Sequence, residues 1–476
     1  MHFLPSLSGF YQKLGAMALS RFITVGTMLA VAMVLTRLLD EADYGGYRKV
    51  WLVYAVLGPA FLNTLASTLY YRGKTDDRDA AIQVNLLLGL LFGLVTALAG
   101  FLFADFWAAQ LNAESLSSSF RAFSPYMGLA VLAGLAEPLF ITLERKKWLL
   151  SYTLGYCMIE FVLIVLPFAL GLPLPYILLI MAIGPGLRCV IVIYVSLRFV
   201  KAFPGRARLT EEFKKSLHYA GGIMLLSIVS VGIIQIDKWV IGVYFIGDAL
   251  YATYEIGAKK LPFITAITSS VSAALVSEYT AKLRAGNYDA ALREARQASS
   301  RLMVLLVPSL VILFIYAEEV LRVLFGGYEA SAPVFRIYLC TLLTQLVYPQ
   351  SIVLGLGRSD VTARYSIYEF IFNLCMSIIL VIFIGFLGPA VATLLAHVLF
   401  TVLLLSFCRR TYGIRPSGFI PVPEKTTLYF FFVVGSAVCI SVFLKHGLNW
   451  QLAGLTVSAA LSGLSSLWWL RRTYQR

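Results

Sequence analysis

Charged residues are scarce in this chain. Asp, Glu, Lys and Arg together make up 13% of its 476 residues, whereas about a quarter of a typical globular domain is charged. Hydrophobic residues make up 59%, and the mean hydropathy is +0.81. A soluble domain cannot bury so much apolar surface, so the sequence indicates that lipid surrounds most of the chain.

Residues that hold metals or form disulfide frameworks are also few. The six cysteines show no Cys-x-x-Cys pair and no grouping with the four histidines, so we predict no disulfide framework, no metal site and no cofactor. We interpret the cysteines as small packing residues and the histidines as scaffold. These residues are Cys157, Cys189, Cys340, Cys375, Cys408, Cys439, His2, His218, His397 and His446.

Long hydrophilic loops are missing as well. The longest gap on the predicted outer side, about residues 105–122, contributes only Asp105, Glu114 and Arg121 as charged groups. These offer no plausible pair for general acid–base chemistry. Gly355-Leu356-Gly357 ends a predicted helix and lacks the nucleotide-loop pattern. The sequence therefore predicts a protein that is not an enzyme.

Apolar runs fill the chain instead. A transmembrane helix needs roughly 20 apolar residues, and fourteen such runs follow one another, which predicts an all-α polytopic membrane protein. The runs are too long for the ten-residue alternation of a β-barrel. The predicted spans are 14–37, 50–71, 84–107, 123–143, 148–171, 174–199, 217–246, 250–281, 302–325, 333–356, 364–386, 388–408, 427–446 and 451–470.

Most of the 39 Lys and Arg residues lie in every second gap between these runs. Basic gaps face the cytoplasm, so both termini are predicted to be cytoplasmic. This topology, together with anionic lipid headgroups, accounts for the net charge of +14. Nucleic acid is not an expected partner, because no basic soluble domain is present.

Short matches recur in the same order along the chain. Residues 41–47 are echoed by 248–254 and residues 79–82 by 289–292, Pro138 corresponds to Pro349, and Leu143-Glu144-Arg145 corresponds to Leu356-Gly357-Arg358. The echo predicts a six-helix lobe (1–200), a basic cytoplasmic linker (201–216), a second six-helix lobe (217–408) and two additional helices (409–476). Transporters with like-oriented repeats bind substrate between the halves and work by alternating access.

Four stretches have a pattern typical of one transporter family. They are Leu35-Thr36-Arg37-Leu38-Leu39 with Asp43-Tyr44-Gly45, Asp237–Gly242 with Tyr251–Tyr254 and Lys259-Lys260-Leu261, Leu324–Val334, and Gly385–Thr393. In this order and with this helix count, the chain resembles the polysaccharide-lipid (O-antigen, Wzx-type) flippases of the multidrug/oligosaccharidyl-lipid/polysaccharide exporter superfamily. Pro389 departs from the small residue expected in the last stretch.

That resemblance implies a function and its partners. The expected activity is flipping of an undecaprenyl-pyrophosphate-linked oligosaccharide from the cytoplasmic to the periplasmic leaflet of the inner membrane. The product would serve lipopolysaccharide O-antigen or exopolysaccharide synthesis. Expected partners are the lipid-linked oligosaccharide, membrane lipids, and glycan polymerase and chain-length proteins.

Basic residues inside the spans are candidate ligands for the pyrophosphate. An ionisable group in a membrane is costly and is taken as functional by default, and Arg and Lys both suit phosphate. The alternatives are structural: Arg21 snorkels to the inner interface, Arg188 pairs with Glu160 or Glu137, and Lys259 pairs with Glu255 at i, i+4. The candidates are Arg21, Arg188, Lys238, Lys259 and Lys260.

Three intramembrane carboxylates, Asp237, Glu137 and Glu160, are candidates for ion coupling. Asp237 and Lys238 are adjacent, so their side chains point about 100° apart on a helix. One is predicted to line a cavity while the other reaches the outer interface. Arg336 and Glu369 are predicted near span ends, and residues 285–301 are predicted to form a helix lying on the inner membrane surface.

Two other functions stay open. A drug or cation antiporter of the same superfamily would share the lobes, although such relatives usually have twelve spans and acidic cavities. A membrane glycan polymerase or ligase would need a larger outer loop than this chain has.

Overall fold

Helices are the only regular elements in the described part of the chain. A computed structural model describes residues 4–73, 77–200, 205–259, 282–283, 286–344, 347–416 and 419. Within these ranges every element is an α-helix or a short 3₁₀ helix, which confirms the predicted all-α class.

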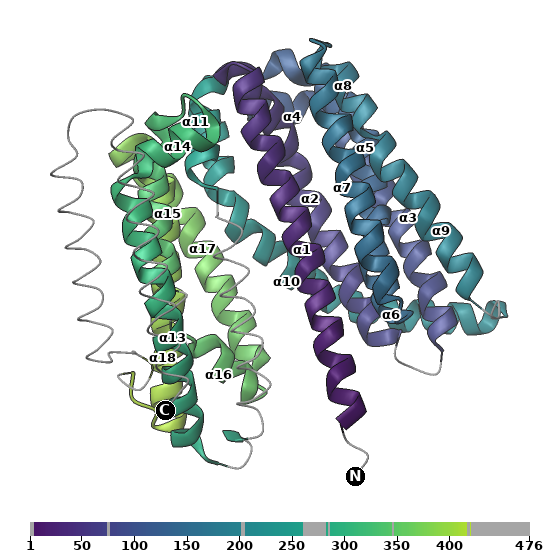
Figure 1. Ribbon diagram of the computed structural model, residues 1–476, viewed down its shortest axis with the longest axis vertical. Helices are drawn as coiled ribbons and strands as arrows, with labels where there is room; N and C mark the ends of the chain where they lie inside the picture. The colour runs from purple at the N-terminus through teal and green to yellow at the C-terminus, as the bar shows by residue number, and fades with distance from the viewer. Residues whose placement is uncertain are drawn as a thin grey trace. The chain divides into compact units, whose positions relative to one another are not determined.

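The chain divides into two compact units, Met1–Ala252 and Thr253–Arg476. The long helices of the first unit run alongside one another (Figure 1). Its elements are α1 (Leu4–Leu38), α2 (Glu41–Arg72), α3 (Arg78–Leu102), α4 (Ala104–Gln110), η1 (Glu114–Leu116), α5 (Ser117–Ala133), α6 (Ala136–Thr142), α7 (Lys146–Ala169), α8 (Leu174–Met181), α9 (Ile183–Phe199) and α10 (Arg206–Tyr244).

The elements that follow begin with α11, which crosses the boundary between the units. They are α11 (Asp248–Gly257), α13 (Tyr288–Ile315), α14 (Ala317–Phe325), η2 (Glu329–Ser331), α15 (Ala332–Thr344), α16 (Pro349–Gly355), α17 (Ser359–Ile384), η3 (Gly385–Leu387) and α18 (Gly388–Tyr412). Eight helical stretches of the described residues are long and apolar enough to cross a membrane, and a ninth arises if α15 and α16 count as one bent span. The predicted spans 427–446 and 451–470, and most of 250–281, lie outside the described residues, so the predicted number of fourteen is consistent with the structure but not tested by it.

Helix α3 shows how these helices face lipid. Leu87, Leu91, Leu94 and Leu98 follow one another at helical spacing and are between 45% and 57% exposed, the reverse of a soluble core helix. Its other face packs against α5. There a Cβ on Gly93 would meet the backbone of α5, so a small residue is what permits the close approach.

The predicted sequence echo recurs as a series of elements. A short helix after a span, a 3₁₀ helix, a longer helix, a break and another short helix appear as α4–η1–α5–α6, and again as α14–η2–α15–α16. Pro138 lies in α6 and Pro349 begins α16, so the two matched prolines occupy equivalent short helices. The repeated series supports the predicted internal repeat, while the lobe boundaries stay a prediction.

One matched pair has the same unusual backbone. Glu144 and Gly357 both have positive φ, at 59° and 74°. In each case the next residue closes the helix end: Arg145 N donates to Phe140 O at 2.9 Å, and Arg358 N donates to Val353 O at 3.1 Å. This is the Schellman pattern of a helix C-terminus, which favours glycine. The first half therefore carries a strained residue where the second half has Gly.

Replacing Gly357 by Ala should lower the free energy of unfolding by about 1 kcal/mol, because a Cβ is disfavoured in the left-handed region. Glu144→Gly should raise it by a similar amount. Thermal unfolding of the detergent-solubilised variants measures both. Equal melting temperatures for wild type and Gly357→Ala would contradict the assigned backbone.

Two expectations about helix extents need correction. Residues 288–301 do not form a separate surface helix: they are the first half of α13, which continues without a break into the predicted span at 302–315. Residues 206–216 of the predicted linker are likewise the start of α10. A hydropathy window detects only the apolar part of a helix, so it misses the polar turns that continue the helix beyond the lipid.

Candidate functional site

Arg21 is the most open of the predicted cations that the structure describes. It lies on α1, two residues into the candidate span Leu19–Leu38. Its Nε donates to Glu137 Oε1 of α6 at 3.2 Å, and the side chain remains 63% exposed while that of Glu137 is 29% exposed. The guanidinium is therefore held at one nitrogen and keeps other donors for a ligand.

Arg188 on α9 is largely enclosed, with 18% of its side chain exposed. Its Nη1 donates to Glu160 Oε1 at 3.0 Å and its Nε to Tyr152 Oη at 2.8 Å, both on α7. Its guanidinium also lies 4.3 Å from the centre of the Tyr156 ring, within reach for cation–π attraction. The predicted pairing with Glu160 is confirmed.

Hydroxyl groups join α1, which carries Arg21, to α7, which carries Glu160. Ser20 Oγ and Thr153 Oγ1 lie 2.7 Å apart, and Thr24 Oγ1 and Tyr156 Oη lie 2.5 Å apart, where α1 packs along α7. Figure 1 shows these two helices as the long purple helix and a teal helix of the first unit. We name the set the N-terminal polar cluster: Ser20, Arg21, Thr24, Glu137, Tyr152, Thr153, Tyr156, Glu160 and Arg188. It brings four of the eight predicted site residues together.

Asp237 and Lys238 on α10 form a second, smaller group. Lys238 Nζ lies 3.6 Å from Asp237 Oδ1 and donates to Ile234 O at 2.9 Å. The Asp237 side chain is only 1% exposed and that of Lys238 is 13% exposed. Lys238 therefore folds back over its own helix.

Lys259 is paired as the sequence spacing predicts. Its Nζ lies 2.8 and 2.9 Å from the two carboxylate oxygens of Glu255, one turn earlier. Lys260 lies outside the described residues. The four predicted cations whose side chains are described, namely Arg21, Arg188, Lys238 and Lys259, thus all have carboxylate partners.

Lys49 falls in the gap between the predicted spans 14–37 and 50–71, but it lies in α2 with no exposed side-chain surface. Its Nζ is 2.8 Å from Asp248 Oδ1 at the start of α11. The chain approaches so closely here that a Cβ on Gly45 would overlap the Asp248 carbonyl. The sequence match between residues 41–47 and 248–254 had indicated that these two segments occupy equivalent places in the internal repeat.

The other end of α2 carries a second buried ion pair. Arg72 Nε donates to Glu212 Oε1 of α10 at 2.8 Å, and a second bond joins Arg72 Nη2 to Glu212 Oε2. The Glu212 side chain is 2% exposed, and Ser216 Oγ donates to it at 3.2 Å. Since α2 and α10 pack along each other, the Arg72–Glu212 pair joins them directly at one end, while Lys49 of α2 is paired with Asp248, which follows the end of α10.

Glu369 was predicted near a span end. It lies ten residues into α17 and is 4% exposed. His397 Nδ1 of α18 is 2.6 Å from Glu369 Oε1, although the histidine was interpreted as scaffold. Arg336 was also predicted near a span end. Its Nη2 donates to Glu318 Oε1 at 3.2 Å, and its Nε donates to the Phe314 carbonyl oxygen at 3.1 Å.

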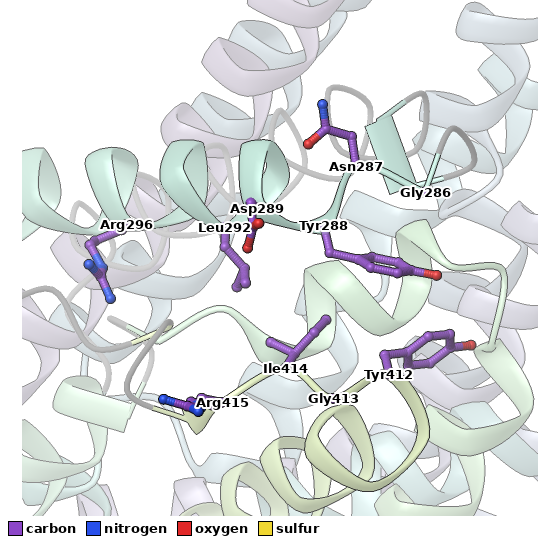
Figure 2. A pocket seen from close by; sticks show the side chains of 10 residues that line it. All are labelled: Gly286, Asn287, Tyr288, Asp289, Leu292, Arg296, Tyr412, Gly413, Ile414 and Arg415. Carbon is purple, nitrogen blue, oxygen red and sulfur yellow. The ribbon is translucent and has the colours of Figure 1, made fainter.

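A surface pocket of about 460 Å³ lies between the start of α13 and the end of α18. Figure 2 shows Arg296 and Arg415 on one side of it and the rings of Tyr288 and Tyr412 on the other. The two ring centres are 5.8 Å apart. The pocket contains none of the predicted site residues.

The sequence comparison decides the family. The family model described as "Polysaccharide biosynthesis protein" matches residues 34–331, more than half of the chain. The chain belongs to this family. The match to the polysaccharide biosynthesis family covers Glu137, Glu160, Arg188, Asp237, Lys238, Lys259 and Lys260 of the predicted site, whereas Arg21 lies before its first residue. No curated protein sequence matches the chain.

Solved structures show how this member of the family folds. A structure titled "Lipid II flippase MurJ, inward closed conformation" matches with a TM-score of 0.72 at 14% identity, covering 98% of this chain and 99% of that one. A MOP superfamily transporter from Pyrococcus furiosus matches at 0.55 and 14% identity, covering 84% and 95%. An inward-facing MATE multidrug transporter matches at 0.55 and 14% identity, covering 83% and 98%. The family member therefore has the fold of the MOP superfamily, as the resemblance predicted.

Proposed function

We propose that the protein is a flippase for a lipid-linked oligosaccharide in cell-surface polysaccharide biosynthesis. The cargo would be carried on undecaprenyl pyrophosphate and moved from the cytoplasmic to the periplasmic leaflet of the inner membrane by alternating access. The membership of the polysaccharide biosynthesis family carries this proposal. A fold similar to that of a lipid II flippase over 98% of the chain supports it.

The N-terminal polar cluster is the proposed contact for the pyrophosphate. Arg21 is open and held by one carboxylate, so a pyrophosphate oxygen can take the place of Glu137 or bind beside it. Such an exchange trades one anion for another and leaves no unpaired charge in a low-dielectric region. Arg188 would orient the cluster through Tyr156 and Thr24 instead of meeting the cargo first, because it is largely enclosed.

The same exchange applies to the remaining predicted cations. Lys238 and Lys259 have carboxylate partners, Asp237 and Glu255, and would release them only to an incoming anion. Lys260 remains a proposed cargo ligand. Glu137, Glu160 and Asp237 would each lose a cationic partner when that partner binds cargo, and uptake of a cation or proton in its place would couple transport to an ion.

Alternating access would open α2 and α10 at one end at a time. The Arg72–Glu212 pair holds the end that the positive-inside rule assigns to the cytoplasm, and Lys49–Asp248 holds the opposite end. Buried pairs suit such a role, because separating the partners is costly unless water reaches them. We propose that both termini and the Arg72 end are cytoplasmic.

An antiporter reading has less support. The MATE multidrug structures match 83–85% of this chain, whereas the lipid II flippase matches 98%. The polymerase or ligase reading draws no support from the fold, which is similar to that of a flippase and of transporters.

Deletion of the gene in a host with no redundant flippase tests the proposal. Surface glycan, measured by lectin or antibody labelling, should disappear, and the lipid-linked precursor should accumulate inside the cell. Expression of the wild-type chain should restore both. Normal surface glycan in the deletion strain would reject the function.

A further inference from the structure

A titratable pair lies at the centre of the α17–α18 packing and has no role in the proposed cargo site. Glu369 Oε1 and His397 Nδ1 are 2.6 Å apart, and the two side chains are 5% and 20% exposed. The residues sit ten positions into α17 and nine positions into α18. Both helices belong to the apolar stretch Ser359–Tyr412 that can cross a membrane.

The groups that could neutralise this pair from outside are few among the described residues. Among the described elements, those with the main packing contacts to α17 and α18 are α15, α16 and η3. Neither α16 nor η3 carries a titratable side chain, and α15 carries Arg336, Tyr338 and Cys340, of which Arg336 is bonded to Glu318. The titratable groups on the two helices themselves are Asp360, Arg364, Tyr365, Tyr368, Cys375, Cys408, Arg409, Arg410 and Tyr412. Within the described ranges, none of these bonds to Glu369 or His397.

Charge balance then assigns one proton to the pair. A carboxylate with an imidazolium, or a carboxylic acid with a neutral imidazole, carries one shared proton and no net charge. Loss of that proton leaves a lone carboxylate, and a second proton leaves a lone imidazolium, and either charge is costly in a low-dielectric interior. Histidine is the side chain that exchanges protons near neutral pH. A proton shared between the two side chains is therefore the arrangement that leaves no unpaired charge at this place.

A polar row extends from the pair along the same interface. Asn373 is one turn after Glu369, and Thr393 is one turn before His397. Asn373 Oδ1 accepts from Ser377 Oγ at 3.2 Å and from Thr393 Oγ1 at 3.4 Å, and Asn373 and Ser377 have no exposed surface. The row runs from the pair toward the η3 turn and offers polar groups along one route between the helices.

We propose that Glu369 and His397 form a proton-binding site that couples the transport cycle to proton movement across the membrane. The proposal rests on the proposed flippase function. Proton uptake would stabilise the α17–α18 packing in the state seen here, and a state with water at the pair would release the proton on the other side.

Glu369→Gln and His397→Gln in the full-length protein test the site directly. In reconstituted vesicles, infrared difference spectra recorded between acid and neutral pH should show the carbonyl band of a buried carboxylic acid in the wild type. That band should be lost in Glu369→Gln and shifted in His397→Gln. The matched controls are His218→Gln and Glu211→Gln, which alter an exposed histidine and an exposed glutamate on α10.

Transport under a pH gradient gives the second measurement. Flipping of an undecaprenyl-pyrophosphate oligosaccharide by wild type should change roughly tenfold when a gradient is imposed, a coupling of ordinary size, and both pair variants should lose this dependence. The double swap Glu369→His with His397→Glu should recover part of it, because the pair is re-formed in reverse. Melting temperatures close to the wild type confirm that the variants fold.

The outcomes separate the two proposals. Wild-type flipping with an unchanged gradient dependence in both pair variants would overturn the proton site and leave the flippase function standing. An infrared spectrum in which Glu369→Gln equals the wild type would overturn it as well. Absence of flipping by the wild type would overturn the flippase function, and with it the coupling role.

Discussion

Replacing Arg21 by Ala should reduce glycan export at least about tenfold. The Arg21 side chain is 63% exposed on a helix of the membrane-spanning unit and has one carboxylate partner. A charge-assisted hydrogen bond to phosphate contributes roughly 1.5–3 kcal/mol, and about 1.4 kcal/mol corresponds to a factor of ten. Surface glycan, normalised to the amount of protein in the membrane, measures the effect.

Further variants at this position separate charge from geometry. Arg21→Lys keeps the charge but loses the fork of donors, so export should be intermediate. Glu137→Gln removes the competing anion, so cargo binding to Arg21 should tighten, while any ion dependence of export that uses Glu137 should be lost. Arg121→Ala is the matched control, because Arg121 is 45% exposed and is also paired with one carboxylate, that of Asp105. Wild-type export by Arg21→Ala at normal abundance would exclude Arg21 as a cargo ligand.

Replacing Arg188 by Ala should instead destabilise the protein and lower its abundance in the membrane. Glu160, whose side chain is 7% exposed, would lose its cation, and breaking a buried pair from one side costs about 3–5 kcal/mol. That is a large part of the stability of a typical domain. Thermal unfolding of the solubilised protein and its abundance in membranes should both fall sharply.

The double variant Arg188→Met with Glu160→Gln decides between the two roles considered for Arg188. Removal of both charges should restore abundance, because no unpaired charge remains. Recovery of export together with abundance would assign Arg188 a structural role. Recovery of abundance without export would show that the pair acts in the transport cycle, through Arg188 as a cargo contact or through Glu160 as an ion-coupling group. A wild-type melting temperature for Arg188→Ala alone would contradict the buried ion pair.

The fold was largely predictable from composition and periodicity. Apolar runs of span length leave only helices as a solution, and the ordered echo anticipated the repeated α4–η1–α5–α6 series. Helix starts were less predictable. Glu369 was placed near a span end because α17 begins at Ser359, several polar residues before its hydropathy rises.

The sequence predicted which types of residue form the site, but it predicted only some of the pairs that they form. The enclosed position of Arg188 made a carboxylate partner necessary, and Glu160 supplies it. The Arg21–Glu137 contact joins residues 116 positions apart, which no local spacing reveals. Lys49 was missed because a lysine beside a predicted loop is usually solvated, whereas here the close approach of Gly45 to Asp248 encloses it.

Transbilayer movement of an undecaprenyl-pyrophosphate-linked oligosaccharide in vesicles containing the purified full-length protein tests the central claim most directly. The fraction of cargo that becomes accessible to an external glycosidase is followed over time. Vesicles with the wild type or Arg121→Ala should expose inner-leaflet cargo much faster than protein-free vesicles, and Arg21→Ala should be close to the protein-free rate. Equal rates with and without the wild-type protein would contradict the account.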